Sequence, residues 1–374
     1  MFTCRLQLIQ KHFNVVIVNC ILALAVTLTA CSGSSLSVPP LSDLTLPGLV
    51  KLASVSALEQ RIGGRRIDEL LPYRNPNDGQ THVVFQSQST YYDTTLDGQR
   101  MTPLTTSCLV GLAITSDGQW GICVAAHRQA LAIHDFTGHT TDHVVDVDTS
   151  SMDYPTNLGW APSWAPDNRR LALISRLGGG CSIAIYQGTP PYTRLDLAAV
   201  LSLPQDVVDS PVGPHCVAGG LNWSPDGAWL LFTSSPFVGY TALPLSSLNL
   251  ATTAAHTPPI TKEIDAAQLL PVNAGAYRAL TWSRKPSVVT YSGNYGQSIE
   301  ETNFVTEQHT KFLIQQVAEI LKLAWTPDGK QLVFVLGVTT TELTPPIPQM
   351  YVFTPPSIQP LQSKGDYTYY SPGH

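Results

Sequence analysis

The sequence is poor in charged residues and has no basic patch. Charged residues make up 13% of the 374 residues, and the net charge is −6; globular domains usually contain about 25% charged residues. A nucleic-acid partner would require a basic face, so the composition argues against nucleic-acid binding. The hydrophobic fraction of 43% is sufficient for a substantial folded core.

Sequence motifs of several enzyme classes are also absent. The chain contains no Gly-x-Ser-x-Gly nucleophile elbow, no His-Glu-x-x-His zinc helix, no phosphate loop and no Gly-x-Gly-x-x-Gly after a strand. The sequence therefore assigns neither a catalytic residue nor a bound cofactor. What it does contain is proline (29 residues) and glycine (27 residues), a composition that suits short strands joined by many turns.

The first thirty residues have the order of a signal peptide. Arg5 and Lys11 precede an apolar run, Phe13 to Leu28, and small residues follow it. The run is shorter than the ~20 residues that a membrane-spanning helix needs, and two asparagines interrupt it. Residues 1–30 are therefore predicted to be a signal peptide, and a permanent transmembrane helix is the weaker alternative.

The segment Leu28-Thr29-Ala30-Cys31 resembles the lipobox of bacterial lipoproteins. The resemblance implies that the thiol of Cys31 carries a lipid, which anchors the chain on the extracytoplasmic side of a bacterial membrane. A plain secretory cleavage site is the alternative. Residues 31–48 are rich in Ser, Gly and Pro, as is typical of a flexible tether.

Four cysteines remain beyond Cys31, namely Cys108, Cys123, Cys181 and Cys216. In an oxidising compartment they allow two disulfides, with three pairings. We expect Cys108 to pair with Cys123, because the two residues flank one predicted hairpin, and Cys181 to pair with Cys216. Four buried free thiols are the alternative.

A short phrase recurs at residues 164–168 (WAPDN), 223–227 (WSPDG) and 325–329 (WTPDG), and an apolar segment of about five residues follows each copy. Pro fixes φ, Asp bonds its own backbone and Gly supplies a positive φ, so the phrase predicts a tight turn between antiparallel strands. The Trp is expected to pack where one sheet stacks on the next. The residues assigned to the repeat are Trp164, Asp167, Trp223, Asp226, Gly227, Trp282, Trp325, Asp328 and Gly329.

Weaker copies of the phrase occur at residues 75–79, 114–118 and 282–286, so that six copies recur at intervals of roughly 40 to 60 residues. Such intervals indicate one supersecondary unit per repeat. Second strands are predicted after several copies, as at Ser182–Tyr186 and Met350–Phe353, which makes each unit a four-stranded sheet.

These repeats resemble the WD40-like, or TolB-type (PD40), β-propeller repeat over roughly residues 70 to 365. The resemblance implies an all-β fold, a β-propeller of six four-stranded blades that spans residues 74–365 and is followed by a tail at 366–374. A seventh blade within Pro236 to Ala276 is the alternative. Residues 49–73 are left unassigned, as either a strand that closes the ring or a short helix.

One tract, residues 127–148, is dense in His and Asp. Imidazole and carboxylate groups could meet a divalent cation there, and the weak candidates are His139, His143 and Asp146. Their spacing matches no established metal signature, so the tract is expected to be a solvated loop without a metal.

Two functions fit these observations. The preferred one is a membrane-anchored, non-catalytic binding or scaffold module for a protein, peptide or glycan, as in other TolB-type propellers, with the intervals Pro236–Pro259 and Glu300–Lys311 as surface loops that carry specificity. The alternative is an extracytoplasmic glycan hydrolase or lyase that uses the His/Asp tract, Glu300 and Glu301, or Asp206 and Asp209 as acid and base. The repeats account for nearly the whole chain and no catalytic constellation does, which favours binding.

Overall fold

The computed structural model describes most of the chain beyond residue 48. The described residues are 49–51, 67–125, 130–147, 162–177, 180–204, 221–235, 239–246, 260–264, 270–272, 279–285, 287–293, 298–313, 318–338, 347–355 and 369–370. They form strands and turns and no α-helix, which confirms the all-β prediction. None of these residues belongs to a helix with the length and hydrophobicity to cross a bilayer.

Six sheets make up this part of the chain, and each is a blade whose own strands are antiparallel neighbours. Blades 1 to 3 contain β2 (Glu69–Arg74), β3 (Thr81–Ser87), β4 (Thr90–Thr95) and β5 (Met101–Pro103); β6 (Cys108–Ile114), β7 (Trp120–Ala125), β8 (Leu131–Asp135) and β9 (His143–Val144); and β11 (Ser163–Trp164), β12 (Arg170–Leu177), β13 (Gly180–Gln187) and β14 (Arg194–Ser202).

Blades 4 to 6 repeat the same order. They contain β15 (Asn222–Trp223), β16 (Trp229–Ser235), β17 (Gly239–Pro244) and β19 (Leu270–Val272); β20 (Leu280–Trp282), β21 (Val288–Gly293), β22 (Ser298–Asn303) and β23 (Gln308–Leu313); and β24 (Ala318–Trp325), β25 (Leu332–Val338), β26 (Ile347–Phe353) and β1 (Leu49–Lys51).

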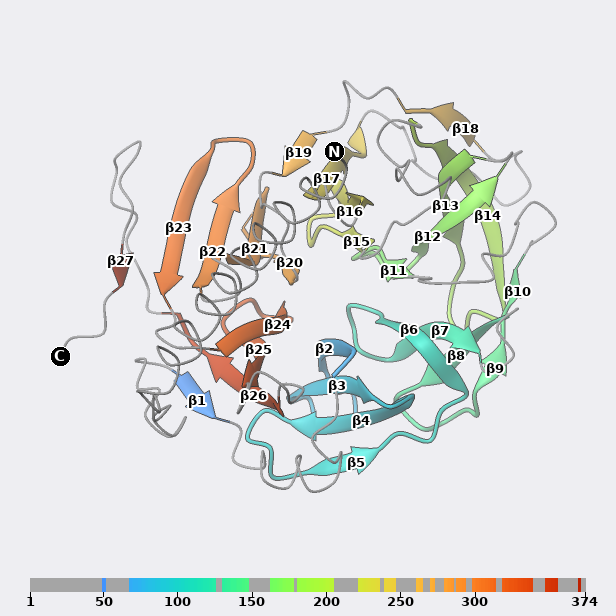
Figure 1. The fold of residues 1–374 in the computed structure, drawn as a ribbon. Helices are drawn as coiled ribbons and strands as arrows, with labels where there is room; N and C mark the ends of the chain where they lie inside the picture. The colour runs from blue at the N-terminus through green and yellow to red at the C-terminus, as the bar shows by residue number, and fades with distance from the viewer. Residues whose placement is uncertain are drawn as a thin grey trace, which may run out of the picture. The chain divides into compact units, whose positions relative to one another are not determined.

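The first strands of successive blades lie side by side and form the inner wall of a ring (Figure 1). β2 contacts β6, β6 contacts β11, β11 contacts β15, β20 contacts β24, and β24 contacts β2. Between β15 and β20, the indole N–H of Trp282 donates to the carbonyl oxygen of Asn222 at 3.1 Å. The sheets therefore form a six-bladed β-propeller, as the repeats predict.

The ring is closed by a strand from the N-terminal side of the propeller. β1 pairs antiparallel with β26, with Leu49 opposite Phe353 and Lys51 opposite Tyr351. Of the two alternatives for residues 49–73, the described residues 49–51 form the strand. Blade 6 thus joins two remote parts of the chain in one sheet, which protects the sheet edge.

Three short strands add to the outer edges of blades in parallel. β10 (Asp146–Val147) and β18 (Ile260–Glu263) both pair with β14 of blade 3, and β27 (Tyr369–Tyr370) pairs with β23 of blade 5. The interval Pro236 to Ala276 therefore contributes strands to blades 3 and 4, and its described residues form no seventh blade.

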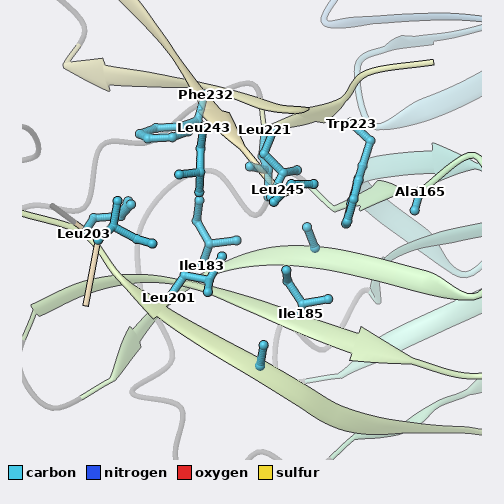
Figure 2. Close-up of a cluster of buried hydrophobic side chains, with 14 residues drawn as sticks. Ala165, Ile183, Ile185, Leu201, Leu203, Leu221, Trp223, Phe232, Leu243 and Leu245 are labelled. Atoms are coloured by element: carbon cyan, nitrogen blue, oxygen red, sulfur yellow. The ribbon is translucent and has the colours of Figure 1, made fainter. Parts of the chain in front are cut away.

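The hydrophobic core lies between adjacent blades. Figure 2 shows the cluster between blades 3 and 4, where Ile183 and Leu201 of one sheet face Phe232 and Leu243 of the next and Trp223 completes the contact. Corresponding clusters join blades 1 and 2, blades 2 and 3, blades 4 and 5, and blades 6 and 1. Each blade buries both of its faces only with its neighbours in place, as is typical of a repeat architecture.

The recurring phrase forms the turn between the first and second strands of a blade. In blade 2, Thr115 Oγ1 donates to Asp117 Oδ1 at 2.6 Å, Asp117 accepts the N–H of Gln119 at 3.0 Å, and Gly118 has φ +76°. The same bonds recur in the turns of blades 4 and 6, where the hydroxyl belongs to Ser224 and Thr326. This hydroxyl stands two residues before each of these Asp residues, and its role was not predicted from the sequence.

These turns also contact the preceding blade. A Cβ atom at Gly118 would lie 1.9 Å from the carbonyl oxygen of Arg74 at the end of β2, and one at Gly227 would lie 3.3 Å from Pro166 Cγ. In blade 3, where Asn168 replaces the glycine with φ +57°, its Oδ1 accepts the N–H of Ser116 at 2.7 Å. The turns therefore link neighbouring blades as well as neighbouring strands.

We expect Gly118→Ala to destabilise the propeller far more than Gly138→Ala. Both glycines have positive φ, but the space around Gly138 is empty within 4 Å, so Gly138→Ala should cost only the backbone strain of about 1 kcal/mol. Gly118→Ala adds a backbone clash and should cost about 3 kcal/mol or more. Urea unfolding of both variants measures the difference, and equal losses would show that the turn does not contact blade 1 closely.

Candidate functional site

The chain connections give the two ends of the ring different properties. The turns between first and second strands lie at one end, which we call the turn end. The connections between second and third strands, and those that lead to the next blade, must lie at the other, the loop end. β14 ends at Ser202 and β15 begins at Asn222, while β10 ends at Val147 and β11 begins at Ser163, so the longest inter-blade connections belong to the loop end.

A carboxylate joins the first strands of blades 1 and 2 at the loop end. Glu69, the first residue of β2, accepts the N–H of Gly111 at 2.6 Å and that of Leu112 at 3.1 Å, both on β6. It also accepts the hydroxyl of Tyr91 at 2.8 Å. Burial raises the pKa of Glu69, although these bonds and the charge of Lys322 on β24 oppose the shift. The carboxylate supports an irregular stretch of β6, where the register with β7 shifts.

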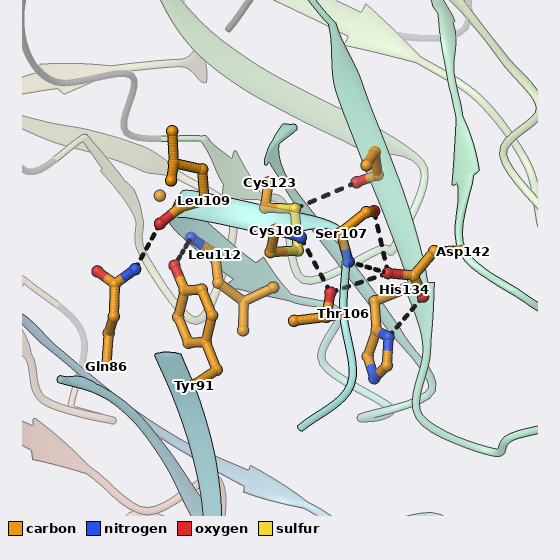
Figure 3. Close-up of a disulfide and its surroundings, with 12 residues drawn as sticks. Gln86, Tyr91, Thr106, Ser107, Cys108, Leu109, Leu112, Cys123, His134 and Asp142 are labelled. Atoms are coloured by element: carbon orange, nitrogen blue, oxygen red, sulfur yellow. Dashed lines mark hydrogen bonds and ion pairs between the residues drawn. A yellow bond between two sulfur atoms is a disulfide. The ribbon is translucent and has the colours of Figure 1, made fainter. Parts of the chain in front are cut away.

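The disulfide Cys108–Cys123 lies beside this contact (Figure 3). Its Cα atoms are 5.4 Å apart, and Cys123 is fully buried, so the predicted pairing of these two cysteines is confirmed. The bond ties the beginning of β6 to β7. On the other side of β6, the side-chain amide of Gln86 donates to the carbonyl oxygen of Leu109.

A second carboxylate holds the connection between blades 1 and 2. Asp142 accepts the hydroxyl of Thr106 at 2.9 Å and the backbone N–H of Ser107 at 2.6 Å, and its other oxygen is 2.7 Å from His134 Nδ1. Burial opposes the negative charge, but the bonds from His134, Ser107 and Thr106 outweigh it and lower the pKa of Asp142 to about 2. Asp142 thus ties the connection between blades 1 and 2 to β8 of blade 2.

The weak metal candidates do not converge. His139 Nδ1 contacts Thr137 Oγ1 at 2.8 Å, His143 Nε2 contacts the carbonyl oxygen of Pro191 at 3.1 Å, and Asp146 is exposed in β10. Among the residues that the structure describes, no three His, Cys, Asp or Glu side chains are grouped to hold a metal ion. The described part of the His/Asp tract contains β8, β9 and β10, so it is not a loop as expected.

The prediction that Glu300–Lys311 is a surface loop is wrong. These residues belong to the hairpin of β22 and β23, and Glu300 and Glu301 occupy consecutive positions, so their side chains point to opposite faces of the sheet. Glu300 contacts Lys311 at 3.0 Å and His309 at 3.2 Å, whereas Glu301 contacts Lys285 at 2.7 Å. The strand therefore separates the two carboxylates instead of presenting them as an acid–base pair.

Several predicted residues lie outside the described residues. They include Cys31, Cys216 and with it the proposed Cys181–Cys216 bond, and the acids Asp206 and Asp209. The prediction for Pro236–Pro259 is wrong in part, because β17 lies within that interval.

A buried histidine in blade 1 was missed at the sequence level. His82 is 4% exposed, and its ring nitrogens contact Asp93 at 2.9 Å and Asp78 at 3.0 Å. Hydrogen bonds that the ring donates to the carboxylates of Asp93 and Asp78 raise the pKa of His82 against the effect of burial. Asp78 is the acid of the faint first copy of the phrase, which lacks the Trp, and this ion group occupies the turn end of blade 1. Both ring nitrogens of His82 are bonded to carboxylates of the same blade. We therefore assign this ion group a role in stabilising blade 1.

We expect the contribution of Glu300 to stability to disappear in acid. Burial disfavours its charge, but hydrogen bonds from His309, Ser298 and Lys311 lower the pKa of Glu300 to about 2 from an ordinary value of 4.5. The stabilisation is therefore complete above about pH 5 and is lost as the pH falls towards 2. Glu300→Gln should cost about 2 kcal/mol at pH 7, and the difference from the native protein should shrink in acid.

Unfolding of both proteins by urea at several pH values between 2 and 7 measures this effect. Glu307→Gln, at an exposed position of the same hairpin, is the control and should match the native protein throughout. A difference for Glu300→Gln that stays constant down to pH 2 would contradict the assignment.

No protein-family model matches the sequence, and no curated protein matches it. Among solved structures, TolB from Acinetobacter baumannii is 15% identical with a TM-score of 0.43, over 80% of this chain and 67% of that one. A chain of the mitotic checkpoint complex is 13% identical with a TM-score of 0.43, over 79% of this chain and 76% of that one.

The Kuenenia stuttgartiensis hydrazine synthase is 11% identical with a TM-score of 0.39, over 62% of this chain. The chain spans only 56% of the length of that enzyme chain. At these identities and TM-scores, the fold assignment rests on the sheet topology of the chain itself, which is that of a six-bladed β-propeller.

Proposed function

We propose that the protein is a non-catalytic binding module that recognises a protein, peptide or glycan at the loop end of its propeller. The observation that carries this proposal is the difference between the two ends. At the turn end, glycines and polar bonds fix the turns of blades 2, 3 and 4 against the preceding blade, although the connection from β17 to β19 also lies at that end. At the loop end, the connections after β10 and β14 are long, and binding residues tend to occupy loops that a rigid scaffold positions.

The hydrogen-bonded carboxylates support binding over catalysis. Glu69, Asp142 and Glu300 each accept several hydrogen bonds from neighbouring blades or strands, so each is engaged in holding the scaffold. A general acid or base needs a proton that it can exchange with a substrate within hydrogen-bond reach. The glycan hydrolase or lyase alternative therefore receives no support from Glu300 and Glu301.

The proposed location is the extracytoplasmic side of a bacterial membrane, with a lipid on Cys31. The support is the lipobox-like sequence and the Ser, Gly and Pro content of residues 31–48, which lead directly into β1. A flexible tether of that length spans about 25 Å on average. Because β1 is part of blade 6, such a tether would attach to the ring at its closing strand.

Site-specific photo-crosslinking in the native host tests the binding end. A photo-reactive residue at Thr105, in the connection between blades 1 and 2, should crosslink to a partner, whereas the same residue at Pro225 in the turn of blade 4 should not. Both positions are exposed, so reactivity alone cannot separate them. Crosslinking at Pro225 alone, or at neither position for any partner class, would contradict binding at the loop end.

The anchor has a separate test. Membrane partition and the mass of the N-terminal peptide should be compared between the native protein and Cys31→Ser. We expect a diacylglyceryl mass on the peptide that begins at Cys31, together with release of the variant into the aqueous fraction, because only the thiol accepts the lipid. An unmodified native protein in the aqueous fraction would refute the anchor and leave the binding proposal intact.

A further inference from the structure

Blade 1 buries a histidine between two carboxylates. His82 Nδ1 lies 2.9 Å from Asp93 Oδ2 on β4, and His82 Nε2 lies 3.0 Å from Asp78 Oδ2 in the turn between β2 and β3. His82 is buried, whereas 30% of the Asp78 side chain is exposed, so the group can exchange protons with solvent. The histidine therefore joins the first turn of the blade to its third strand.

The geometry requires two donors on the ring of His82. Ionised carboxylates only accept hydrogen bonds, and among the forms of imidazole only the imidazolium donates at both nitrogens. A neutral ring would leave the lone pair of one nitrogen facing a carboxylate oxygen. Asp78 also accepts the N–H of Gln80 at 2.9 Å, which lowers the pKa of Asp78 and favours its ionised form. His82 is therefore expected to carry a positive charge.

The neighbours of the ring on and after β2 do not replace these contacts. Asn75 Nδ2 is 3.3 Å from His82 Nδ1, farther than Asp93, and it donates to the hydroxyl of Tyr73 at 3.1 Å. That hydroxyl in turn donates to Asp93 Oδ1 at 3.2 Å, and burial raises the pKa of Tyr73, so the phenol stays neutral. Both groups therefore accommodate the Asp93 carboxylate, and neither adds a charge.

Two charged side chains of the connection after β4 also act on this group. Arg100 favours the ionised form of Asp78, and the charge of His82 favours the ionised form of Asp97. Blade 2 packs against β2 beside the group with the uncharged ring of Phe136. The charge of His82 is therefore balanced by carboxylates of its own blade.

The turn that contains Asp78 also contacts blade 2. Asn77 Nδ2 donates to the carbonyl oxygen of Phe136 at 2.9 Å, and a Cβ atom at Gly118 would lie 1.9 Å from the carbonyl oxygen of Arg74. Movement of this turn would therefore change the junction between blades 1 and 2.

Other blades place apolar side chains at the position of His82. Two residues after the carbonyl that closes each turn, blades 2, 3, 4 and 6 have the fully buried residues Ile122, Ala172, Leu231 and Val333. Apolar residues in place of a buried ion group are often neutral or stabilising. A role in packing alone therefore does not account for the charge of His82.

We propose that His82 is a pH-sensitive switch of the junction between blades 1 and 2. As an imidazolium it bonds Asp78 and Asp93 together and holds the turn in place. Once the ring has lost a proton it can donate to only one carboxylate, so Asp78 is released and the turn loosens.

The direction of the switch follows from the contacts of the ring. The hydrogen bond to Asp93 raises the pKa of His82 above its ordinary value of 6.5. The stabilisation is therefore complete below about pH 6.5 and is lost as the pH rises through the raised value. The switch lies at the turn end, so it does not depend on the proposed function.

The charge of His82 can be measured directly. The probe is the ¹⁵N NMR spectrum of the full chain labelled at histidine, with His82 assigned by comparison with His82→Gln. At pH 7 an ordinary imidazole is mostly neutral, but both ring nitrogens of His82 should carry a proton, and one proton should be lost at higher pH. A neutral His82 at pH 7 would overturn the proposal.

Amide hydrogen exchange measures the response of the turn. Relative to an unstructured peptide at the same pH, the protection of Gly79 and Gln80 should fall at least about tenfold between pH 6 and pH 9, because a charge-assisted hydrogen bond is lost. The control is the turn of blade 4, where Leu231 replaces the histidine, and the protection of Gly227 and Ala228 should stay constant.

Asp78→Asn separates the switch from simple packing. An amide can accept from the charged ring and donate to the neutral one, so the variant should keep its turn protected across this pH range. Protection of the native turn that stays constant while His82 titrates would contradict the proposal, and so would a pH dependence in Asp78→Asn equal to that of the native protein.

Discussion

The turn between the first and second strands of each blade is the contact on which the ring depends. This turn must reverse the chain within a few residues. It must also lie close to the preceding blade, so that the first strands of the two blades can contact each other. The Ser or Thr hydroxyl and the Asp carboxylate satisfy backbone N–H groups inside the turn. Gly supplies the positive φ and the absence of a side chain where the neighbour approaches. The spacing of the blades follows from this local chemistry.

Polar groups between blades follow from the same geometry. Where first strands lie close together, backbone N–H groups are shielded from water, and each of these groups needs a hydrogen-bond acceptor. Glu69 provides one where β6 is irregular, and Trp325 Nε1 donates to Thr290 across blades 5 and 6 at 2.7 Å. The acids that the described part of the chain buries, Asp135, Glu300 and Glu301, all have bonded partners, as expected of buried charges, which persist only when they are bonded.

The sequence predicted the features that arise from local chemistry and missed those that arise from distant pairing. The phrase at 223–227 determines its own turn, and the apolar segments after each copy are strands in the structure. The hairpin of β22 and β23 was predicted to be a loop because we counted Glu300–Lys311 among the long, Pro/Thr/Ser-rich intervals of the sequence. Only the register across three strands reveals that Tyr291, Glu300 and Lys311 form a bonded row.

From the sequence, the closing strand was only one of two alternatives for residues 49–73, and the edge strands β18 and β27 were not predicted, for the same physical reason. β1, β18 and β27 are two to four residues long, too short to show a hydrophobic periodicity. Each forms a strand because it pairs with the edge of a sheet built from another part of the chain. The turn end permits little change, since its glycines and hydroxyls have neighbours within van der Waals or hydrogen-bond distance. Insertions accumulate instead in the loop-end connections, in the connection from β17 to β19 and at the outer edges, where a specific partner can be bound without disturbing the ring.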